Sequence, residues 1–96
     1  MLIVYGGVKV KPEAVAELQE KAGPFEAATR AEAGCVQYVL SWRLDDPTRV
    51  QLLEAWEKRE AWQAHKTQPH TKEWSAWIPG VAAGPPAFTV AEGEKD

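Results

Sequence analysis

The chain has 96 residues, of which 45% are hydrophobic and 26% charged, and its net charge is −3. One domain of this size buries a single modest core, and the lack of clustered Lys and Arg argues against nucleic acid as a partner. The single cysteine, Cys35, excludes an internal disulfide, and no apolar run approaches the ~20 residues of a membrane span. We therefore expect one cytoplasmic domain over residues 1–96, with no membrane segment and a polar tail at 92–96.

The first third of the chain predicts a strand followed by a helix. Residues 2–11 are apolar at both parities of a strand, and Gly6-Gly7 within them indicates a bulge or a close approach by another backbone or a ligand. Pro12 opens a helix that Gly34 ends, and Gly23-Pro24 should kink or divide that helix near its middle. Three- and four-residue spacing gives the helix one inward stripe, made of Val15, Leu18, Ala22, Phe25 and Thr29.

A hairpin is predicted after this helix. Residues 35–43 and 49–56 read as strands, joined by a turn of the composition Leu-Asp-Asp-Pro-Thr at 44–48. In the second of these strands, Glu54 shares a face with two aliphatic residues and Trp56, so a charge breaks the apolar pattern there. The first of them has one face made of Val36, Tyr38, Leu40 and Trp42.

Two helical segments and a last strand complete the pattern. Residues 58–66 predict a short helix, which Pro69 interrupts. A second helical segment follows, and Pro79-Gly80 stops it. Residues 87–91 predict the last strand.

The predicted order is therefore strand, helix, strand, strand, helix, strand. Each strand–helix–strand half is a split βαβ unit, and together they predict an α+β, ferredoxin-like βαββαβ fold with helices on one face of a four-stranded antiparallel sheet. The first strand is apolar on both faces, so the sheet face without helices also needs cover. We expect a homodimer that packs through this open sheet face, as a dimeric α+β barrel.

Four short motifs in chain order make the sequence resemble a known family. They are Glu32-Ala-Gly-Cys35 with Tyr38, then Glu54-x-Trp56, then Ala61-x-x-x-His65, then Pro69-His70. The ordered set resembles the antibiotic biosynthesis monooxygenase (ABM) superfamily. This resemblance implies a dimeric ferredoxin-like fold with a pocket in each subunit between the sheet and its helices.

The resemblance also bears on the reaction. Some members oxidise quinols or polycyclic phenols without metal or flavin, and the run from His65 to His70 is similar to members that isomerise a phosphorylated autoinducer breakdown product. A third branch degrades haem with an asparagine, a tryptophan and a histidine, but this chain has no asparagine and carries Gly6-Gly7 on the strand concerned. We expect a monooxygenase of a phenolic, quinol or polycyclic aromatic molecule that needs no cofactor. The alternatives are an isomerase of a small keto-compound, with Lys66 and Lys72 near any phosphate, and a non-catalytic ligand-binding or accessory domain.

His65 and Glu54 are the candidate catalytic residues. An imidazole titrates near neutral pH, so His65 beside Trp62 is suited to act as a general base on a phenol or an enolisable ketone. The alternative is a structural histidine that bonds a neighbouring backbone carbonyl. Burial of Glu54 in an apolar strand would raise its pKa and suit it to acid–base chemistry, whereas the alternative is a salt bridge to Arg43 or to another basic residue.

Aromatic side chains supply most of the candidate substrate-binding residues, because flat surfaces stack on a planar substrate. His70 joins them, with helix capping or a surface role as its alternative. His65 and His70 stand five positions apart across a proline, which is no standard zinc-ligand spacing, so we expect no metal. The aromatic candidates are Tyr38, Trp42, Trp56 and Trp62, whereas Trp74 and Trp77 are expected in core or dimer packing.

Overall fold

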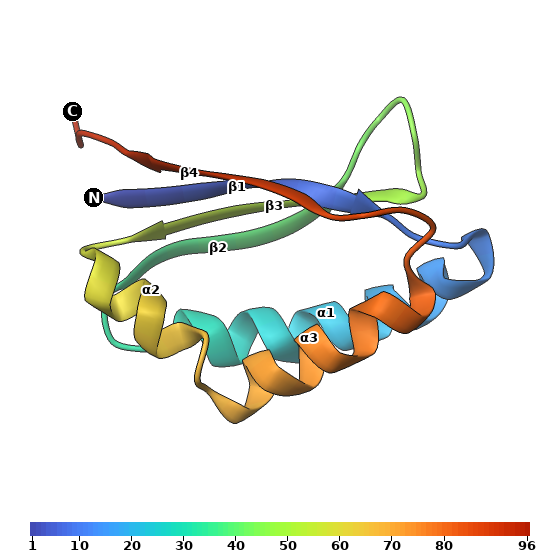
Figure 1. The fold of residues 1–96 in the computed structure, drawn as a ribbon, viewed down its shortest axis with the longest axis horizontal. Coiled ribbons are helices and arrows are strands. Elements are labelled where there is room, and N and C mark those ends of the chain that lie inside the picture. Colours follow the sequence, from blue (N-terminus) through green and yellow to red (C-terminus); the bar gives the residue numbers. More distant parts are fainter.

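Four strands form one antiparallel sheet in the computed structural model of the chain, which describes residues 1–96 (Figure 1). They are β1 (Leu2–Lys9), β2 (Cys35–Trp42), β3 (Arg49–Trp56) and β4 (Ala87–Glu92), in the spatial order β2-β3-β1-β4. Every neighbouring pair runs antiparallel. This arrangement is that of two split βαβ units, so the predicted ferredoxin-like fold is confirmed.

The helices lie together on one face of the sheet, as Figure 1 shows. A 3-10 turn, η1 (Pro12–Ala14), leads into α1 (Val15–Arg30). The short α2 (Arg59–His65) precedes α3 (Pro69–Val81). None of these helices is long and apolar enough to cross a membrane.

Two prolines lie inside helices that the sequence predicts they would interrupt. α1 continues through Gly23-Pro24, so the predicted division is wrong, and α3 continues past Pro79-Gly80 to Val81. All four of these residues are exposed, and nothing packs beside either glycine. The missing amide hydrogen bonds therefore lie on the solvent side, where water satisfies the freed carbonyls and a bend costs little.

β2 begins with an irregularity in its pairing to β3. Cys35 pairs with Trp56 and Gln37 with Ala55, so the register of the pairing shifts between Cys35 and Gln37. The predicted alternation is therefore wrong at Val36, which is 49% exposed, while Cys35 packs against the core. Burial raises the pKa of the Cys35 thiol, which suits a small packed side chain rather than a nucleophile.

A close approach of neighbouring backbones explains Gly6-Gly7 in β1. Gly6 has a φ of +155°, and a side chain there would meet the Ala87 carbonyl and the Phe88 ring. A side chain on Gly7 would meet the Val50 carbonyl. Pairing to β3 and β4 runs through both glycines without a slip, so the predicted close approach is confirmed and no bulge is present.

The core fills the space between the sheet and the helices in two neighbouring clusters. The predicted inward stripe of α1 contributes Leu18, Phe25 and Thr29, which are buried. The first cluster consists of Leu2, Val4, Phe25, Tyr38 and Trp56, and the second of Val8, Val10, Leu18 and Val50.

The two edges of the sheet differ. Side chains of α1 occupy the free edge of β2: Glu26 accepts a 2.8 Å hydrogen bond from the Leu40 amide, and Arg30 Nε donates to the Tyr38 carbonyl at 2.9 Å. At the opposite edge every residue of β4 is exposed. Side chains of α1 therefore cover part of the β2 edge, whereas the β4 edge is open.

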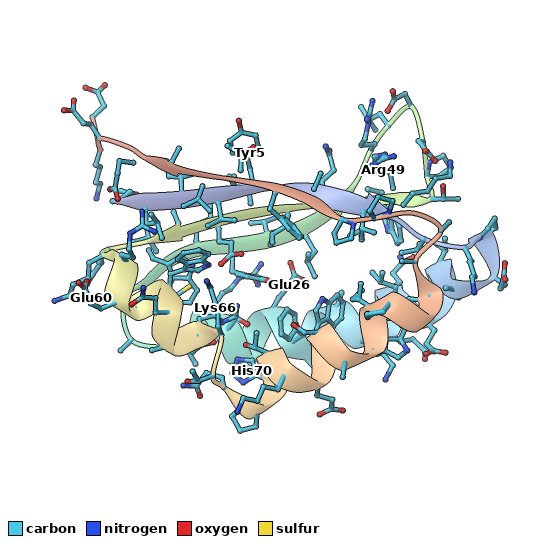
Figure 2. The ribbon with its side chains drawn as sticks, in the orientation of Figure 1. Tyr5, Glu26, Arg49, Glu60, Lys66 and His70 are labelled. Carbon is cyan, nitrogen blue, oxygen red and sulfur yellow. The ribbon has the colours of Figure 1, made fainter.

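The sheet face opposite the helices carries uncovered apolar side chains. Tyr5 of β1 and Leu53 of β3 are a cross-strand pair and are 51% and 40% exposed. Figure 2 shows Tyr5 projecting away from the helices. The apolar surface on which the homodimer prediction depends is present, and the dimer itself stays a prediction.

Candidate functional site

A cavity of about 230 Å³ lies between the helix-facing side of the sheet and α3. Tyr38, Gln51 and Ser75 are the polar residues of its lining, and no Lys or Arg lines it. Apolar walls with a few polar groups are typical of small-molecule sites, although this cavity is smaller than the roughly 300–1,000 Å³ usual for them. The apolar walls come chiefly from Leu40, Leu52, Trp74, Ile78 and Phe88.

Tyr38 is the predicted binding residue that lies in this wall. It is 3% exposed, and its ring packs edge-on against Phe25 with the ring centroids 5.5 Å apart. Burial, followed by the carboxylate of Glu54, raises the pKa of the phenol far above its ordinary value. The hydroxyl therefore keeps its proton and is available as a hydrogen-bond donor.

Glu54 is the cross-strand partner of Tyr38 on β3. It is 4% exposed, and its Oε1 accepts a 2.8 Å hydrogen bond from the indole N–H of Trp56. Burial raises the pKa of this carboxyl, and the Trp56 hydrogen bond and the nearby His65 offset part of that effect. Glu54 is therefore buried, as the acid–base interpretation requires, and no salt bridge to it is formed, because Arg43 pairs with Asp45 instead.

His65, the last residue of α2, packs into the same group of side chains. It is 4% exposed, and its ring centroid lies 5.0 Å from that of Trp56 and 5.5 Å from that of Tyr38. Its Nδ1 lies 2.8 Å from Glu32 Oε2 and 3.2 Å from Thr71 Oγ1. The alternative of a bond to a backbone carbonyl is therefore wrong, because the main partner is a carboxylate.

Three neighbouring side chains each keep one polar atom without a partner in the chain: the Tyr38 hydroxyl, Glu54 Oε2 and His65 Nε2. The only fully buried side-chain polar atom that lacks a partner is Thr29 Oγ1. The other three are therefore not sealed, and each keeps surface that water or a ligand can reach. Because a buried polar group without a partner is costly, a bound hydroxyl or carbonyl would find ready partners here.

Glu32, in the loop between α1 and β2, bridges the two histidines of the chain. Its Oε2 lies 2.8 Å from His65 Nδ1 and 2.7 Å from His70 Nε2. Side-chain exposure rises from 5% at His65 through 10% at Glu32 to 26% at His70. α3 has no side-chain cap, so the capping alternative for His70 is wrong and its partner is Glu32.

The same three side chains are the one group whose ligand atoms lie close enough together for a metal ion, all within 4.8 Å. Two imidazoles and a carboxylate are a familiar zinc ligand set. A tetrahedral zinc, however, holds its ligand atoms about 3.3 Å apart, whereas Glu32 Oε2 lies within 2.8 Å of both nitrogens. This spacing is that of one carboxylate oxygen accepting two hydrogen bonds.

The structure places the other predicted site residues outside the lining of the cavity. His65 and Glu54 adjoin Tyr38 but do not line the cavity themselves. Trp56 is fully buried in the core, beside His65. Trp62 lies on α2, with Lys66 Nζ stacked over it at 3.5 Å from the ring centroid. Trp42 lines a separate pocket of about 230 Å³ against α1. Tyr38 is thus the one predicted aromatic that borders the cavity.

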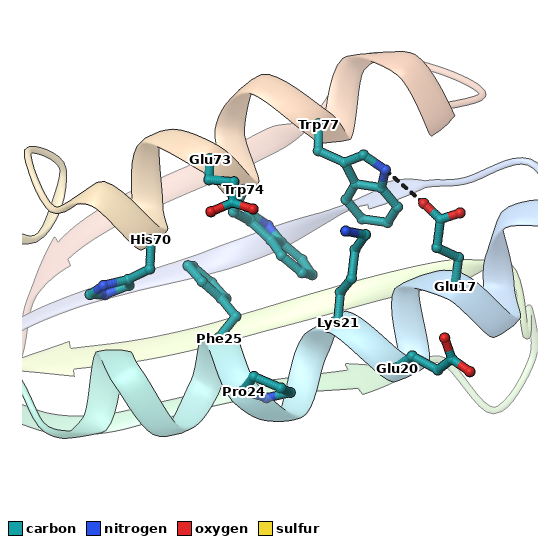
Figure 3. Close-up of a pocket in the computed structure, with 9 residues that line it drawn as sticks. All are labelled: Glu17, Glu20, Lys21, Pro24, Phe25, His70, Glu73, Trp74 and Trp77. Atoms are coloured by element: carbon teal, nitrogen blue, oxygen red, sulfur yellow. Dashed lines mark hydrogen bonds between the residues drawn. The ribbon is translucent and has the colours of Figure 1, made fainter.

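A wider, open groove of about 470 Å³ runs between α1 and α3 (Figure 3). The Trp77 indole donates to Glu17 at 2.9 Å, and Trp74 stacks flat on Phe25 with ring centroids 4.5 Å apart. His70 lies near one end of the groove. Because Trp74 also lines the inner cavity, its indole is part of the wall between groove and cavity.

Of the site residues that sequence reasoning did not predict, two are instructive. Glu32 stands in the motif before Cys35, but nothing local links it to histidines 33 and 38 positions further on. Phe88 borders the cavity beside Gly6, and only the pairing of β1 with β4 brings them together. The two adjacent glycines in an apolar strand were the one available signal for such a neighbour.

The chain is thus a ferredoxin-like domain with a small apolar cavity between its sheet and its helices. Comparison with known families agrees with this architecture. Residues 1–77 match the family described as antibiotic biosynthesis monooxygenase. The chain therefore belongs to that family, which confirms the resemblance read from its motifs.

Solved structures support this assignment. A Nitrosomonas europaea protein, itself only provisionally described as an antibiotic biosynthesis monooxygenase, matches with a TM-score of 0.91 at 25% identity, over 97% of this chain and 98% of that chain. Rv0793 from Mycobacterium tuberculosis matches with a TM-score of 0.89 at 26% identity, over 99% and 96% of the two chains. Among curated proteins, the uncharacterized protein sll1783 of Synechocystis is 27% identical over 89 residues, which are 93% of this chain and 60% of that protein. The chain thus spans less than two thirds of that relative.

Proposed function

We propose that the protein is a cofactor-independent monooxygenase whose substrate, a small phenol or quinol, occupies the cavity beside Tyr38. The observation that carries this proposal is the double position of Tyr38: it borders the apolar cavity and also adjoins Glu54 and His65. Apolar and aromatic walls suit a planar ring. The absence of Lys and Arg from the lining favours this substrate class over a phosphorylated keto-compound.

In this proposal the reaction begins with removal of the phenolic proton. His65 Nε2 accepts the proton, and the electron pair of the broken O–H bond stays on the substrate oxygen. The carboxylates of Glu32 and Glu54 lie near the imidazolium that forms. The Tyr38 hydroxyl, which keeps its proton, donates a hydrogen bond to the new oxyanion.

The anion is electron-rich enough to pass one electron to O2, and the resulting substrate radical and superoxide combine. A ring C–H is thereby converted to a carbonyl. One atom of O2 remains in the product and the other leaves as water, together with the hydrogens of the ring C–H and the phenol. Reduction of both oxygen atoms takes four electrons, and the substrate supplies all four as it loses two hydrogens and gains the new carbonyl oxygen, so the reaction balances without a bound reductant.

Oxygen consumption by the purified protein tests the proposal. An oxygen electrode would follow uptake with anthrone and quinol substrates, for the native protein and for His65→Gln, which preserves most of the side-chain volume. Gln63→Ala, an exposed change on the same helix, is the matched control. We expect native uptake above the uncatalysed rate, with a large loss only in His65→Gln.

Three outcomes would speak against the proposal. Oxygen uptake that is unchanged in His65→Gln would show that His65 is not the base. Turnover of a keto-compound without oxygen consumption would favour the isomerase, and quenching of tryptophan fluorescence by an aromatic ligand without turnover would favour a binding domain.

A further inference from the structure

We propose that Glu32 is the positioning residue of this site: it holds His65 in the tautomer protonated at Nδ1 and leaves Nε2 as the atom that accepts the substrate proton. The catalytic meaning of this inference rests on the proposed function. The tautomer itself is a property of the free protein and is measurable without a substrate.

The distances fix where the proton lies. A neutral imidazole carries its proton on one nitrogen, and an ionised carboxylate only accepts hydrogen bonds. Nδ1 of His65 lies 2.8 Å from Glu32 Oε2, so the proton of the ring is on Nδ1. The hydroxyl of Thr71, 3.2 Å from the same nitrogen, rotates freely and adapts to either tautomer.

The position of Glu32 is itself held from a second direction. His70 Nε2 lies 2.7 Å from the same carboxylate oxygen and donates to it from the start of α3. With only 10% of its side chain exposed, Glu32 has little freedom to turn toward solvent. A carboxylate between two donors from α2 and α3 is therefore a fixed acceptor, as an orienting group must be.

The second ring nitrogen of His65 decides whether the ring is able to meet a ligand. Here Nε2 has no partner in the chain and is not sealed from water or ligand. The other titratable groups around the ring are Tyr38 and Glu54 on the sheet, Lys66 just after α2, and His70 on α3. Of these, Glu54 adds a second negative charge near the ring when it is ionised.

Nitrogen-15 NMR of histidine-labelled protein tests the tautomer directly. We expect neutral His65 in the native protein to be protonated at Nδ1, and Glu32→Ala to lower the share of that tautomer. Gln63→Ala, an exposed change on the same helix, is the matched control, because it leaves Glu32 and both of its histidine partners in place; the tautomer should persist. Native His65 protonated at Nε2 would overturn the inference, whether or not any variant folds.

If a substrate is turned over, steady-state kinetics test the catalytic effect of Glu32. Glu32→Ala should lower kcat at least about tenfold while KM changes less than about twofold, and Glu32→Asp should restore part of the loss. Unchanged kcat in folded Glu32→Ala would overturn the positioning role. So would zinc chloride that shifts the signals of both histidines stoichiometrically, since the cluster would then be a metal site. If no substrate is oxidised, the proposed function fails while the tautomer measurement still decides the role of Glu32.

Discussion

Replacing Glu54 with glutamine should stabilise the protein at neutral pH. Burial raises the pKa of this carboxyl above its ordinary value of 4.5, so the ionised form is less favourable in the folded chain than in the unfolded one. Between 4.5 and the raised value, the folded state binds more protons than the unfolded state. Stability therefore falls as the pH rises through this window, and above it the whole penalty is present.

The magnitude follows from the same linkage. Each unit by which the pKa is raised corresponds to about 1.4 kcal/mol of stability lost above the window. Glutamine keeps an oxygen for the indole N–H of Trp56, a hydrogen bond worth about 1 kcal/mol, and its amide nitrogen takes the place of the unpartnered Oε2. In a domain of this size 1 kcal/mol moves Tm by about 4–8 °C, so we expect a gain of several degrees.

Thermal unfolding followed by circular dichroism between about pH 4 and pH 7 measures this effect. The Tm of Glu54→Gln should exceed that of the native protein by an amount that grows with pH. Glu57→Gln, an exposed change three positions further on, should show no such growth. A Glu54→Gln protein less stable than the native one at neutral pH, or a Tm difference independent of pH, would refute the reasoning.

Three further changes test other parts of the structure. Tyr38→Phe keeps the ring that packs on Phe25 but removes the unpartnered hydroxyl. Affinity for a phenolic ligand, measured by fluorescence titration, should therefore fall about fivefold. Equal affinity would show that the hydroxyl does not contact the ligand. Gly6→Ala places a methyl group against the Ala87 carbonyl at a φ of +155°, and urea unfolding should show a loss of more than about 1 kcal/mol. A native-like midpoint would contradict that contact. Leu53→Asp puts a charge on the open sheet face and should turn dimers into monomers in sedimentation velocity; a native monomer would contradict the predicted association.

Periodicity along the chain was sufficient to order the strands and helices, because each element carries its own apolar pattern. It also placed Glu54 on the same strand face as two aliphatic residues and Trp56, although parity alone did not decide between a buried carboxyl and a salt bridge. The helix ends were less predictable: Pro24 and Pro79 remain inside their helices because both face solvent, and solvent exposure is a property of the tertiary structure.

The candidate site was only partly predictable for a related reason. His65 stood out because its residue type titrates near neutral pH. Its carboxylate partner Glu32 lies 33 positions away, and the fold alone brings the loop before β2 to the end of α2. No local pattern reports a contact of that kind, whereas the two glycines of β1 did report a close neighbour at Phe88.

The unequal edges of the sheet limit how copies of this protein can assemble. A sheet with two free edges is able to add further strands at both ends and so grow into a filament. Here Glu26 and Arg30 already occupy backbone groups on the outer side of β2, which leaves β4 as the only edge free to pair along its length. Two copies that join by a two-fold axis through β4 consume both remaining edges, so strand pairing ends at two chains. Glu26 and Arg30, which bind α1 to the edge of β2, would thus also prevent growth of the sheet into a fibre.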